Sequence, residues 1–378
     1  MTWAEDACGC GLIMNKNEII RIHGTEYKEM TKRLLNEASL SAHISSKDMM
    51  IGIKPNLVSP TPAMFGATTH PEVVAGIIEY LFENGFKNVM MLEGSWVGDK
   101  TSDAYEYCGY RELSEQYDVP FYDTQKDGFH EVECDGLTLN ICDVVDKVDF
   151  MINVPVLKGH GQTKITCALK NMKGLIPNSE KRHFHTMGLH KPIAHLSKGI
   201  HQDFIVVDHI CGDLDFEDGG NPVVRNCIMA ALDPVLVDSY VCKLLGYDIS
   251  DVPYVKMAEE IGSGSTDIEN AVIRNINEPE WPDEGTRVRK TLSVSYAVNQ
   301  VDSCSACYAN LVPALLRLEE EGLLQKLDTQ ISIGQGHQGK GGKLGVGKCT
   351  SGHDTCIMGC PPSEEKIYAE LKAYIEKA

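Results

Sequence analysis

One stretch, Asn153–Pro177, constrains the fold of this chain more than any other. An apolar run over 150–156 predicts a short buried strand, which Gly159 brings to an end. A helical segment is expected to follow from Thr163 to Met172 and to stop at Gly174. A strand, a glycine-rich turn and a helix in this order are typical of open α/β sheets, in which ligands bind beyond the carboxyl ends of the strands.

The same stretch opens a strongly basic window in an acidic chain. The whole chain has a formal net charge of −19, whereas the window Asn153–His201 holds eight Lys or Arg, six His and a single acid, Glu180. This basic window therefore carries a net charge of +7, and the rest of the chain carries −26. A basic island in an acidic protein indicates a focused site for an anion. A solvated basic face that balances acids folded against it is the alternative.

Other predicted strands also end in polar residues. Lys54 and Asn56 follow the apolar residues 49–53, and Asp208 follows the apolar run 204–207. Because such ends converge on one side of a parallel sheet, we expect these residues and the basic window to line one cleft. Histidines there can bind a metal, transfer protons or hold an anion. The candidate catalytic residues are Lys158, Lys170, His183 and His185, and the candidate substrate-binding residues are Lys54, Asn56, Asn171, Arg182 and Asp208.

Fourteen cysteines are many for a chain without an export signal, and five of them lie between Cys304 and Cys360. The pair Cys304 and Cys307 opens a predicted helix, whose first amides stabilise thiolates. A cysteine followed by proline, as at Cys360, is frequent among iron–sulfur ligands. We expect one 4Fe–4S cluster; a structural zinc site and a thiol redox pair are the alternatives. The expected ligands are Cys304, Cys307, Cys349 and Cys360, with Cys356 as alternate; the role of Cys8 and Cys10 stays open.

Length and hydropathy set the organisation of the chain. With 378 residues it is long enough for two domains, and a turn-rich, charged segment at 276–290 is expected to link a domain at 1–275 to one at 291–378. No window approaches 18 uninterrupted apolar residues and the N-terminus has no signal pattern, so we expect a cytoplasmic protein. The net charge argues against broad contact with nucleic acid or an anionic membrane.

Six motifs, in this order, resemble the domain-of-unknown-function 362 family over about 50–262. The closing GKC…GCPP resembles the iron–sulfur segment often attached to that family, although its cysteines are dispersed and do not form a ferredoxin-like run. The resemblance implies a fold more than a reaction. A more distant similarity to proteins of the lactate-racemase type brings no matching catalytic motif. The six motifs are KPNLV (54–58), THPEVV (69–74), NVPVLKGH (153–160), CALKNMKGLIP (167–177), VVDHICG (206–212) and LDPVLVDSYVCKLLGY (232–247).

Residues and resemblance together predict an α/β protein. It has a large domain with a mixed or parallel sheet and helices on both faces, plus a small C-terminal α/β cysteine-rich domain that binds a cluster. The leading functional hypothesis is an iron–sulfur oxidoreductase or electron-transfer protein that takes electrons from a ferredoxin-type donor. It acts on a small anionic substrate held in a Lys/His-rich cleft. The alternative is a non-redox anion-binding protein or enzyme whose cluster or zinc is only structural.

Overall fold

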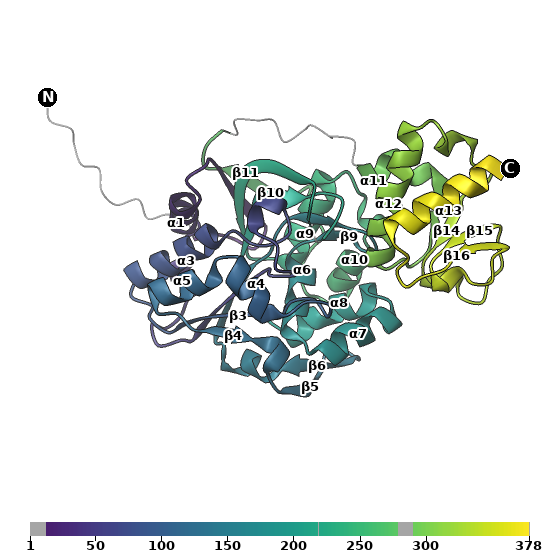
Figure 1. The fold of residues 1–378 in the computed structure, drawn as a ribbon. Coiled ribbons are helices and arrows are strands. Elements are labelled where there is room, and N and C mark those ends of the chain that lie inside the picture. Colours follow the sequence, from purple (N-terminus) through teal and green to yellow (C-terminus); the bar gives the residue numbers. More distant parts are fainter. Residues whose placement is uncertain (1–12, 218, 279–289, 378) are drawn as a thin grey trace, which may run out of the picture.

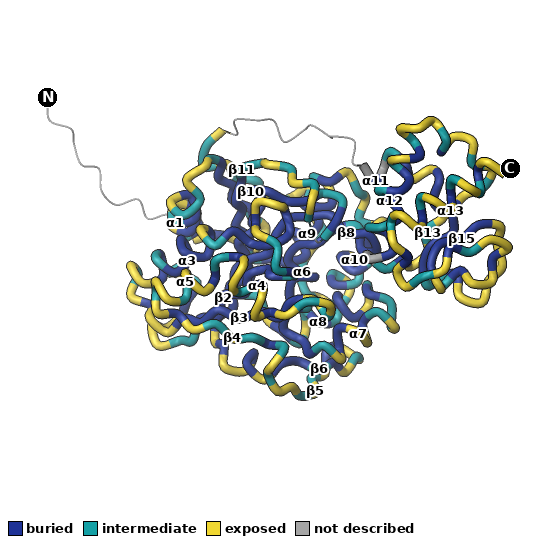
Figure 2. Tube along the Cα trace, in the orientation of Figure 1, coloured by how far each residue is buried: buried dark blue, intermediate teal, exposed yellow. Residues whose placement is uncertain are grey.

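The structure is a computed structural model that describes residues 13–217, 219–278 and 290–377 (Figure 1). The chain forms a large α/β unit and a smaller C-terminal α/β unit, and each has a hydrophobic core of its own (Figure 2). The predicted fold class is therefore confirmed. The predicted linker, 276–290, lies mostly outside the described residues, so the exact domain boundary stays a prediction.

The large unit is built on an eight-stranded sheet in the order β12-β1-β11-β10-β7-β2-β3-β4. Strand β11 runs antiparallel to both of its neighbours, and all other neighbouring pairs are parallel. The central strands are buried along their whole length, as expected for strands covered on both faces. The strands are β1 (Glu18–His23), β2 (Ile51–Pro55), β3 (Val89–Glu93), β4 (Phe121–Asp123), β7 (Phe150–Val154), β10 (Phe204–Asp213), β11 (Pro222–Ala231) and β12 (Val272–Asn275).

Helices cover both faces of this sheet (Figure 1). The chain moves toward β4 between β1, β2 and β3, but it moves the opposite way between β7 and β10. Because such crossovers are right-handed, the two directions place their helices on opposite faces. One face carries α1 (Tyr27–Glu37), α3 (Pro71–Glu83), α4 (Thr101–Tyr107) and α5 (Tyr110–Tyr117), and the other carries α6 (Ala168–Asn171), α8 (His190–Gly199), α9 (Pro234–Leu244) and α10 (Pro253–Glu260).

Shorter elements complete the large unit. The hairpin of β5 and β6 lies beyond the edge strand β4, and helix α7 packs against α8. None of the helices in the described ranges has both the length and the apolar character needed to cross a lipid bilayer. The bounds are α2 (Leu40–His43), β5 (Phe129–Glu133), β6 (Thr138–Cys142) and α7 (Asn178–Met187).

The helix predicted from Thr163 to Met172 is wrong in its first half. Strands β8 (Lys158–His160) and β9 (Lys164–Thr166) form an antiparallel hairpin there, and Lys158, expected just past a strand, begins β8. The β-branched side chains at 163, 165 and 166 favour extended backbone over helix. Helix α6 begins only at Ala168, where the buried Asp238 carboxylate accepts the amides of Ala168 and Leu169.

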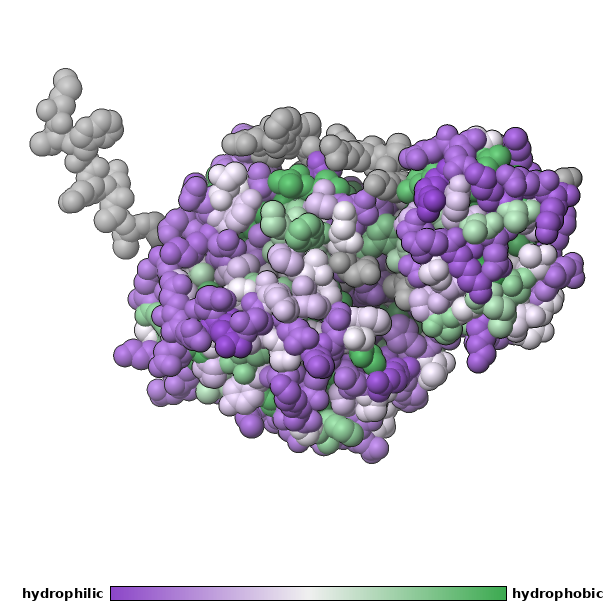
Figure 3. Space-filling model, viewed as in Figure 1, coloured by the Kyte–Doolittle hydropathy of each residue, from purple (hydrophilic) through white to green (hydrophobic). Residues whose placement is uncertain are grey.

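The C-terminal unit is a four-stranded parallel sheet in the order β13-β14-β15-β16, with helices α12 and α13 packed together against it. It stands as a lobe beside the large unit, and the visible face of both is mostly hydrophilic (Figure 3). The elements are α11 (Lys290–Ser293), β13 (Val298–Gln300), α12 (Ser305–Glu320), β14 (Ile331–Ile333), β15 (Leu344–Val346), β16 (Thr355–Ile357) and α13 (Glu364–Lys377).

The acidic turn after β10 joins the two units. The side chain of Phe216 packs into the core of the C-terminal unit, and the carboxylate of Asp215 accepts the amide and the hydroxyl of Thr291. On the same side, Gln300 accepts from Lys164 and donates to the carbonyl of Gly161. The C-terminal unit is therefore anchored beside the hairpin of β8 and β9.

Candidate functional site

A buried ion pair marks the carboxyl edge of the sheet. The strands β7, β2 and β3 are parallel neighbours, so their ends meet there. Lys54, near the end of β2, places its Nζ 2.6 Å from Oε2 of Glu93, the last residue of β3, and both side chains are at most 3% exposed. Burial lowers the pKa of Lys54, and the carboxylate of Glu93 opposes this. The polar strand end predicted at Lys54 thus holds a buried ion pair.

Three asparagines surround this pair. Asn171 accepts at Oδ1 from Lys54 Nζ (3.1 Å) and Asn56 Nδ2 (2.8 Å), and it donates through Nδ2 to Asn153 Oδ1 (2.7 Å). A Cβ atom on Gly174 would lie 1.8 Å from Glu93 Oε1 and 2.6 Å from Lys54 Nζ, so only glycine lets the backbone approach the pair. The asparagines are held by bonds between residues far apart in the sequence.

Three basic residues contact Glu217, which lies in the acidic turn after β10. Its Oε2 lies 2.7 Å from Lys170 Nζ and 3.0 Å from His160 Nε2, and its backbone carbonyl accepts from Lys158 Nζ (2.7 Å). Lys158 also donates to Asn56 Oδ1 (3.1 Å), which connects this group to the asparagines. Burial alone would raise the pKa of Glu217, but His160 and Lys170 hold it well below its ordinary value. Burial lowers the pKa of His160 to about 4.

Three more basic side chains complete the cluster. Lys173 is half-buried in the turn after α6, 5.8 Å from the ring centroid of Phe184, and has no hydrogen-bond acceptor within the described ranges. Burial and the neighbouring Lys170 lower the pKa of Lys173 to about 7. Lys181 donates to two backbone carbonyls, and burial lowers its pKa to about 8. Burial and Lys173 lower the pKa of His185 to about 4.

We call this cluster the lysine site. It contains five lysines but only two carboxylates, so its charges do not balance when the lysines are protonated. The sequence predicted Lys54, Lys158, Lys170, Asn56, Asn171 and His185, and the structure brings them together. It missed Glu93, His160, Lys173, Lys181 and Glu217. The signals in the sequence are faint: Glu93 follows the apolar residues 89–92, and Glu217 is one of several acids in its turn. The lysine site consists of Lys54, Lys158, Lys170, Lys173, Lys181, Glu93, Glu217, His160 and His185.

Two predicted site residues, Arg182 and His183, lie outside the lysine site. Both are exposed on α7; the Arg182 guanidinium contacts the backbone carbonyl of Asn178, and Nδ1 of His183 lies 3.2 Å from Glu180. Helical periodicity explains the separation, because residues 181, 184 and 185 face inward and the two between them face outward.

The third predicted residue that the structure places elsewhere is Asp208. Its buried carboxylate lies 2.8 Å from Nδ1 of His70 and also accepts the backbone amide of His70. Although burial would lower the pKa of His70, the Asp208 carboxylate raises it. The partner that Asp208 neutralises is therefore a histidine, while Lys54 and Lys170 are paired with Glu93 and Glu217.

Four of the predicted metal ligands approach one another at the start of α12. Cys304 caps this helix and Cys307 lies in its first turn. A hydrogen bond between the two thiols lowers the pKa of Cys304 to about 6 and raises that of Cys307. Cys349 and Cys360 lie close enough to Cys307 to raise its pKa electrostatically. These cysteines, some of which are far apart in the sequence, thus lie close together in the folded chain.

The alternate ligand, Cys356, has protein partners of its own. Its Sγ lies 3.5 Å from the carbonyl of Gly347 and 3.4 Å from Oγ1 of Thr350. Within the described ranges, no three His, Cys, Asp or Glu side chains are arranged to share one metal ion. The cluster and its ligands therefore stay a prediction, and Cys8 and Cys10 lie outside the described residues.

A cavity of about 120 Å³ lies between the hairpin of β8 and β9 and the C-terminal unit. We call it the junction cavity. His160, whose Nε2 contacts Glu217, lines one wall, and Tyr308, which follows Cys307 directly in α12, lines another. Residues of both units thus line the cavity, and one of them, His160, belongs to the lysine site. Further lining residues are Lys164, Asp215, Thr291 and Gln300.

Two solved structures share a distant likeness with this chain. The lactate racemase apoprotein from Thermoanaerobacterium thermosaccharolyticum aligns with a TM-score of 0.42 and 12% identity, over 62% of this chain and 57% of that one. A structural-genomics protein from Thermotoga maritima aligns with a TM-score of 0.40 and 13% identity, over 59% of this chain and 60% of that one. The chain spans less than two thirds of the length of either structure.

Sequence comparison places the lysine site within a known family. A thylakoid-associated protein of Synechocystis sp. is 25% identical over 228 residues, which cover 57% of this chain and 68% of that protein. Residues 51–243, just over half of the chain, match the family described as Domain of unknown function (DUF362). This range contains every residue of the lysine site and none of the predicted cysteine ligands. The chain therefore belongs to the DUF362 family.

Proposed function

We propose that this protein is an oxidoreductase that holds a small anionic substrate at the lysine site and uses an iron–sulfur cluster bound by its C-terminal unit. The observation that carries the proposal is the imbalance of charge at the lysine site. Glu93 neutralises Lys54 and Glu217 neutralises Lys170, but Lys173 has no acceptor among the described residues. Because Lys170 and Lys181 repel the ammonium of the half-buried Lys173, an anion that joins it there is stabilised.

Proton transfer is the chemistry that these side chains supply. Lys173, with a pKa of about 7, is close to half-protonated at neutral pH, so it can both donate and accept a proton. His185, with a pKa of about 4, is neutral there and acts as a base. A bound anion would stabilise the protonated form of both. Lys158 and Lys170, bonded to Glu217, add positive charge behind Lys173, and the bonded Asn56 and Asn171 hold these side chains in place.

The cysteines at the start of α12 would supply the redox function. A 4Fe–4S cluster on Cys304, Cys307, Cys349 and Cys360 would provide single electrons, received from a ferredoxin-type donor. The junction cavity supports this pairing of functions, because residues of both units line it. As part of this proposal, we expect the protein to act in the cytoplasm.

A non-redox enzyme is the second candidate, and one observation favours it. Lys173 and His185 can transfer protons without electrons, and the family match contains them but excludes the C-terminal cysteines. In that case a cluster or a zinc ion only stabilises the small C-terminal unit. Iron, sulfide and zinc analysis after anaerobic purification, followed by a reductive titration of the cluster, separates the two. A cluster that no ferredoxin-type donor reduces would favour the non-redox enzyme.

Anion-dependent melting tests the binding site itself. Sulfate or a dicarboxylate is expected to raise the melting temperature in a saturable manner, because either binds only the folded lysine site. Lys173→Gln should abolish this shift without lowering the stability of the anion-free protein. Lys191→Gln is the matched control, since Lys191 is an exposed lysine of the same basic window. An equal shift in Lys173→Gln, or no shift in the unmodified protein, would refute anion binding at the lysine site.

A further inference from the structure

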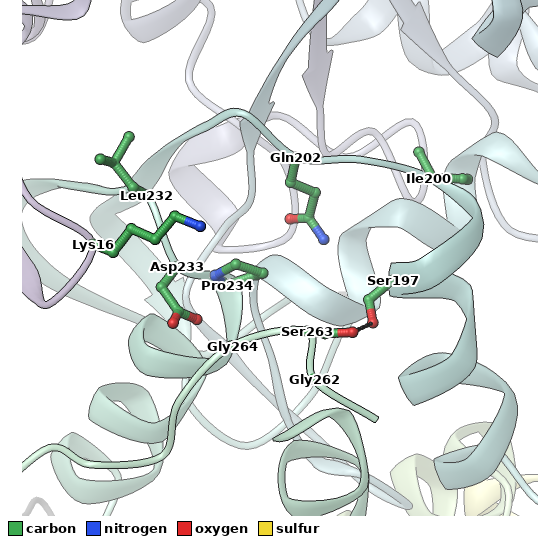
Figure 4. A pocket seen from close by; sticks show the side chains of 10 residues that line it. All are labelled: Lys16, Ser197, Ile200, Gln202, Leu232, Asp233, Pro234, Gly262, Ser263 and Gly264. Atoms are coloured by element: carbon green, nitrogen blue, oxygen red, sulfur yellow. Dashed lines mark hydrogen bonds between the residues drawn. The ribbon is translucent and has the colours of Figure 1, made fainter. Parts of the chain in front are cut away.

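A second cavity lies at the opposite edge of the sheet from the lysine site. Its volume is about 240 Å³. Lys16, which precedes β1, and Gln202, which precedes β10, line it, so it adjoins the amino ends of these parallel strands (Figure 4). We call it the amino-edge cavity. The other lining residues used below are Ser197, Asp233, Ser263 and Gly264.

Two opposite charges line the amino-edge cavity. Lys16 is exposed and Asp233 is 9% exposed, and no ion pair joins them in the described part of the chain. In Figure 4 the lysine side chain extends over the cavity beside the carboxylate. A simple anion in the cavity would be repelled by Asp233, and a simple cation by Lys16. A ligand that carries both charges would match both residues.

The carboxylate of Asp233 is fixed but not saturated. Its Oδ1 accepts the amides of Val235 and Leu236, and its Oδ2 accepts that of Ser265 (2.9 Å). A Cβ atom on Gly264 would lie 2.0 Å from Oδ1, so glycine is needed for the loop to pass this close. Since two carboxylate oxygens offer about four acceptor positions, one position remains for a cationic donor. Burial raises the pKa of Asp233, and a bound cation would oppose this.

Gln202 presents an unused donor to the same cavity. Asn153 donates through Nδ2 to the carbonyl of Ala168 (2.9 Å) and to Gln202 Oε1 (2.6 Å), while its own Oδ1 accepts from Asn171. This fixes the amide of Asn153, so Gln202 must turn its oxygen toward it. The Nε2 of Gln202 is then buried without an acceptor among the described residues, and Figure 4 shows the amide directed into the cavity. A buried donor of this kind calls for an acceptor from a ligand.

We propose that the amino-edge cavity binds a small α-amino acid as its zwitterion. The carboxylate of the ligand accepts from Gln202 Nε2 and Lys16 Nζ. Its ammonium group donates to Asp233 Oδ2 and to the hydroxyl of Ser263, which lies 2.6 Å from that of Ser197. A cavity of about 240 Å³ leaves room for a small amino acid. This inference does not rest on the function proposed above.

Calorimetric titration with glycine, L-alanine and L-serine tests the proposal, and acetate and ethylammonium serve as half-ligands. We expect saturable binding of at least one amino acid and at least tenfold weaker binding of both half-ligands, because each meets only one of the two charges. No binding of the three amino acids at millimolar concentration would overturn the proposal. Acetate binding as tightly as alanine would also overturn it, because the cavity would then be a simple anion site.

Variants test the three contacts separately. Lys16→Gln removes the exposed cation, Asp233→Asn removes the charge but keeps a good helix cap, and Gln202→Glu keeps an acceptor for Asn153 while removing the donor. Each should weaken amino-acid binding at least tenfold. Lys198→Gln, an exposed lysine on α8 that does not line the cavity, should bind as the unmodified protein does. Unchanged binding in Lys16→Gln, whose exposed position makes misfolding no explanation, would overturn the proposal.

Discussion

The lysine site and the cysteine segment, Cys304–Pro362, differ in how their reactive groups are held. In the lysine site, carboxylates, amides and carbonyls accept hydrogen bonds from four of the five lysines, mostly through bonds that span 39 to 117 residues of sequence. In the cysteine segment, Cys304, Cys349 and Cys356 are half-buried and Cys360 is exposed, on short strands and turns. The protein thus supplies hydrogen-bond acceptors to four of these lysines, and among the described residues Lys173 is the one left for a ligand, whereas no carboxylate or lysine is bonded to the thiols there.

The largest effect is expected from the cysteines. Cys304→Ser, Cys307→Ser, Cys349→Ser and Cys360→Ser should each abolish the binding of iron and acid-labile sulfide, measured after anaerobic purification, because each removes a predicted ligand. Cys356→Ser is the matched control and should retain the cluster, since its Sγ already lies near Gly347 and Thr350. Stoichiometric zinc without sulfide would refute the cluster, and an indispensable Cys356 beside a dispensable Cys349 would refute the ligand assignment.

The buried ion pair should give the next largest effect. Glu93→Gln leaves the ammonium of Lys54 buried without a carboxylate, so the free energy of unfolding should fall by about 3–5 kcal/mol. Denaturant titration measures this loss. Lys54→Met combined with Glu93→Leu should recover much of it, because no unpaired charge then remains. Glu269→Gln, in an exposed pair with Lys243, should change stability very little. A similar small change in Glu93→Gln would mean that the pair does not organise the lysine site.

The smallest effect concerns the pH dependence of anion binding. Burial lowers the pKa of Lys173 from 10.5 to about 7, so its charge is lost as the pH rises through 7. Sulfate, which does not titrate in this range, should therefore bind about tenfold more weakly at pH 8 than at pH 6. Lys173→Gln should bind weakly at both values, and Lys191→Gln should follow the unmodified protein. Affinity independent of pH would show that Lys173 keeps its charge and is not the group that meets the anion.

Local patterns in the sequence were sufficient for the architecture. Apolar runs that end in polar residues predicted the strands β2, β7 and β10, and a parallel sheet brings such ends to one edge. The helix expected between 163 and 172 is wrong in its first half. There the β-branched side chains favour the hairpin, and the cap from Asp238, which is 70 residues away from Ala168, fixes where α6 begins. A contact between residues so far apart cannot be predicted from the local sequence.

The sequence by itself determined the α/β class, the basic window and the lysines at the carboxyl edge, because strand periodicity and charge are local properties. Only the tertiary structure decided which acids neutralise them. Glu93 and Glu217 reach Lys54 and Lys170 across 39 and 47 residues, and several other acids in the same turn offered the same charge. The pairing follows from the order of strands in the sheet and the path of the turn after β10. These depend on packing throughout the chain, so only the folded structure shows that, among the described residues, Lys173 is the lysine of the site without a hydrogen-bond acceptor.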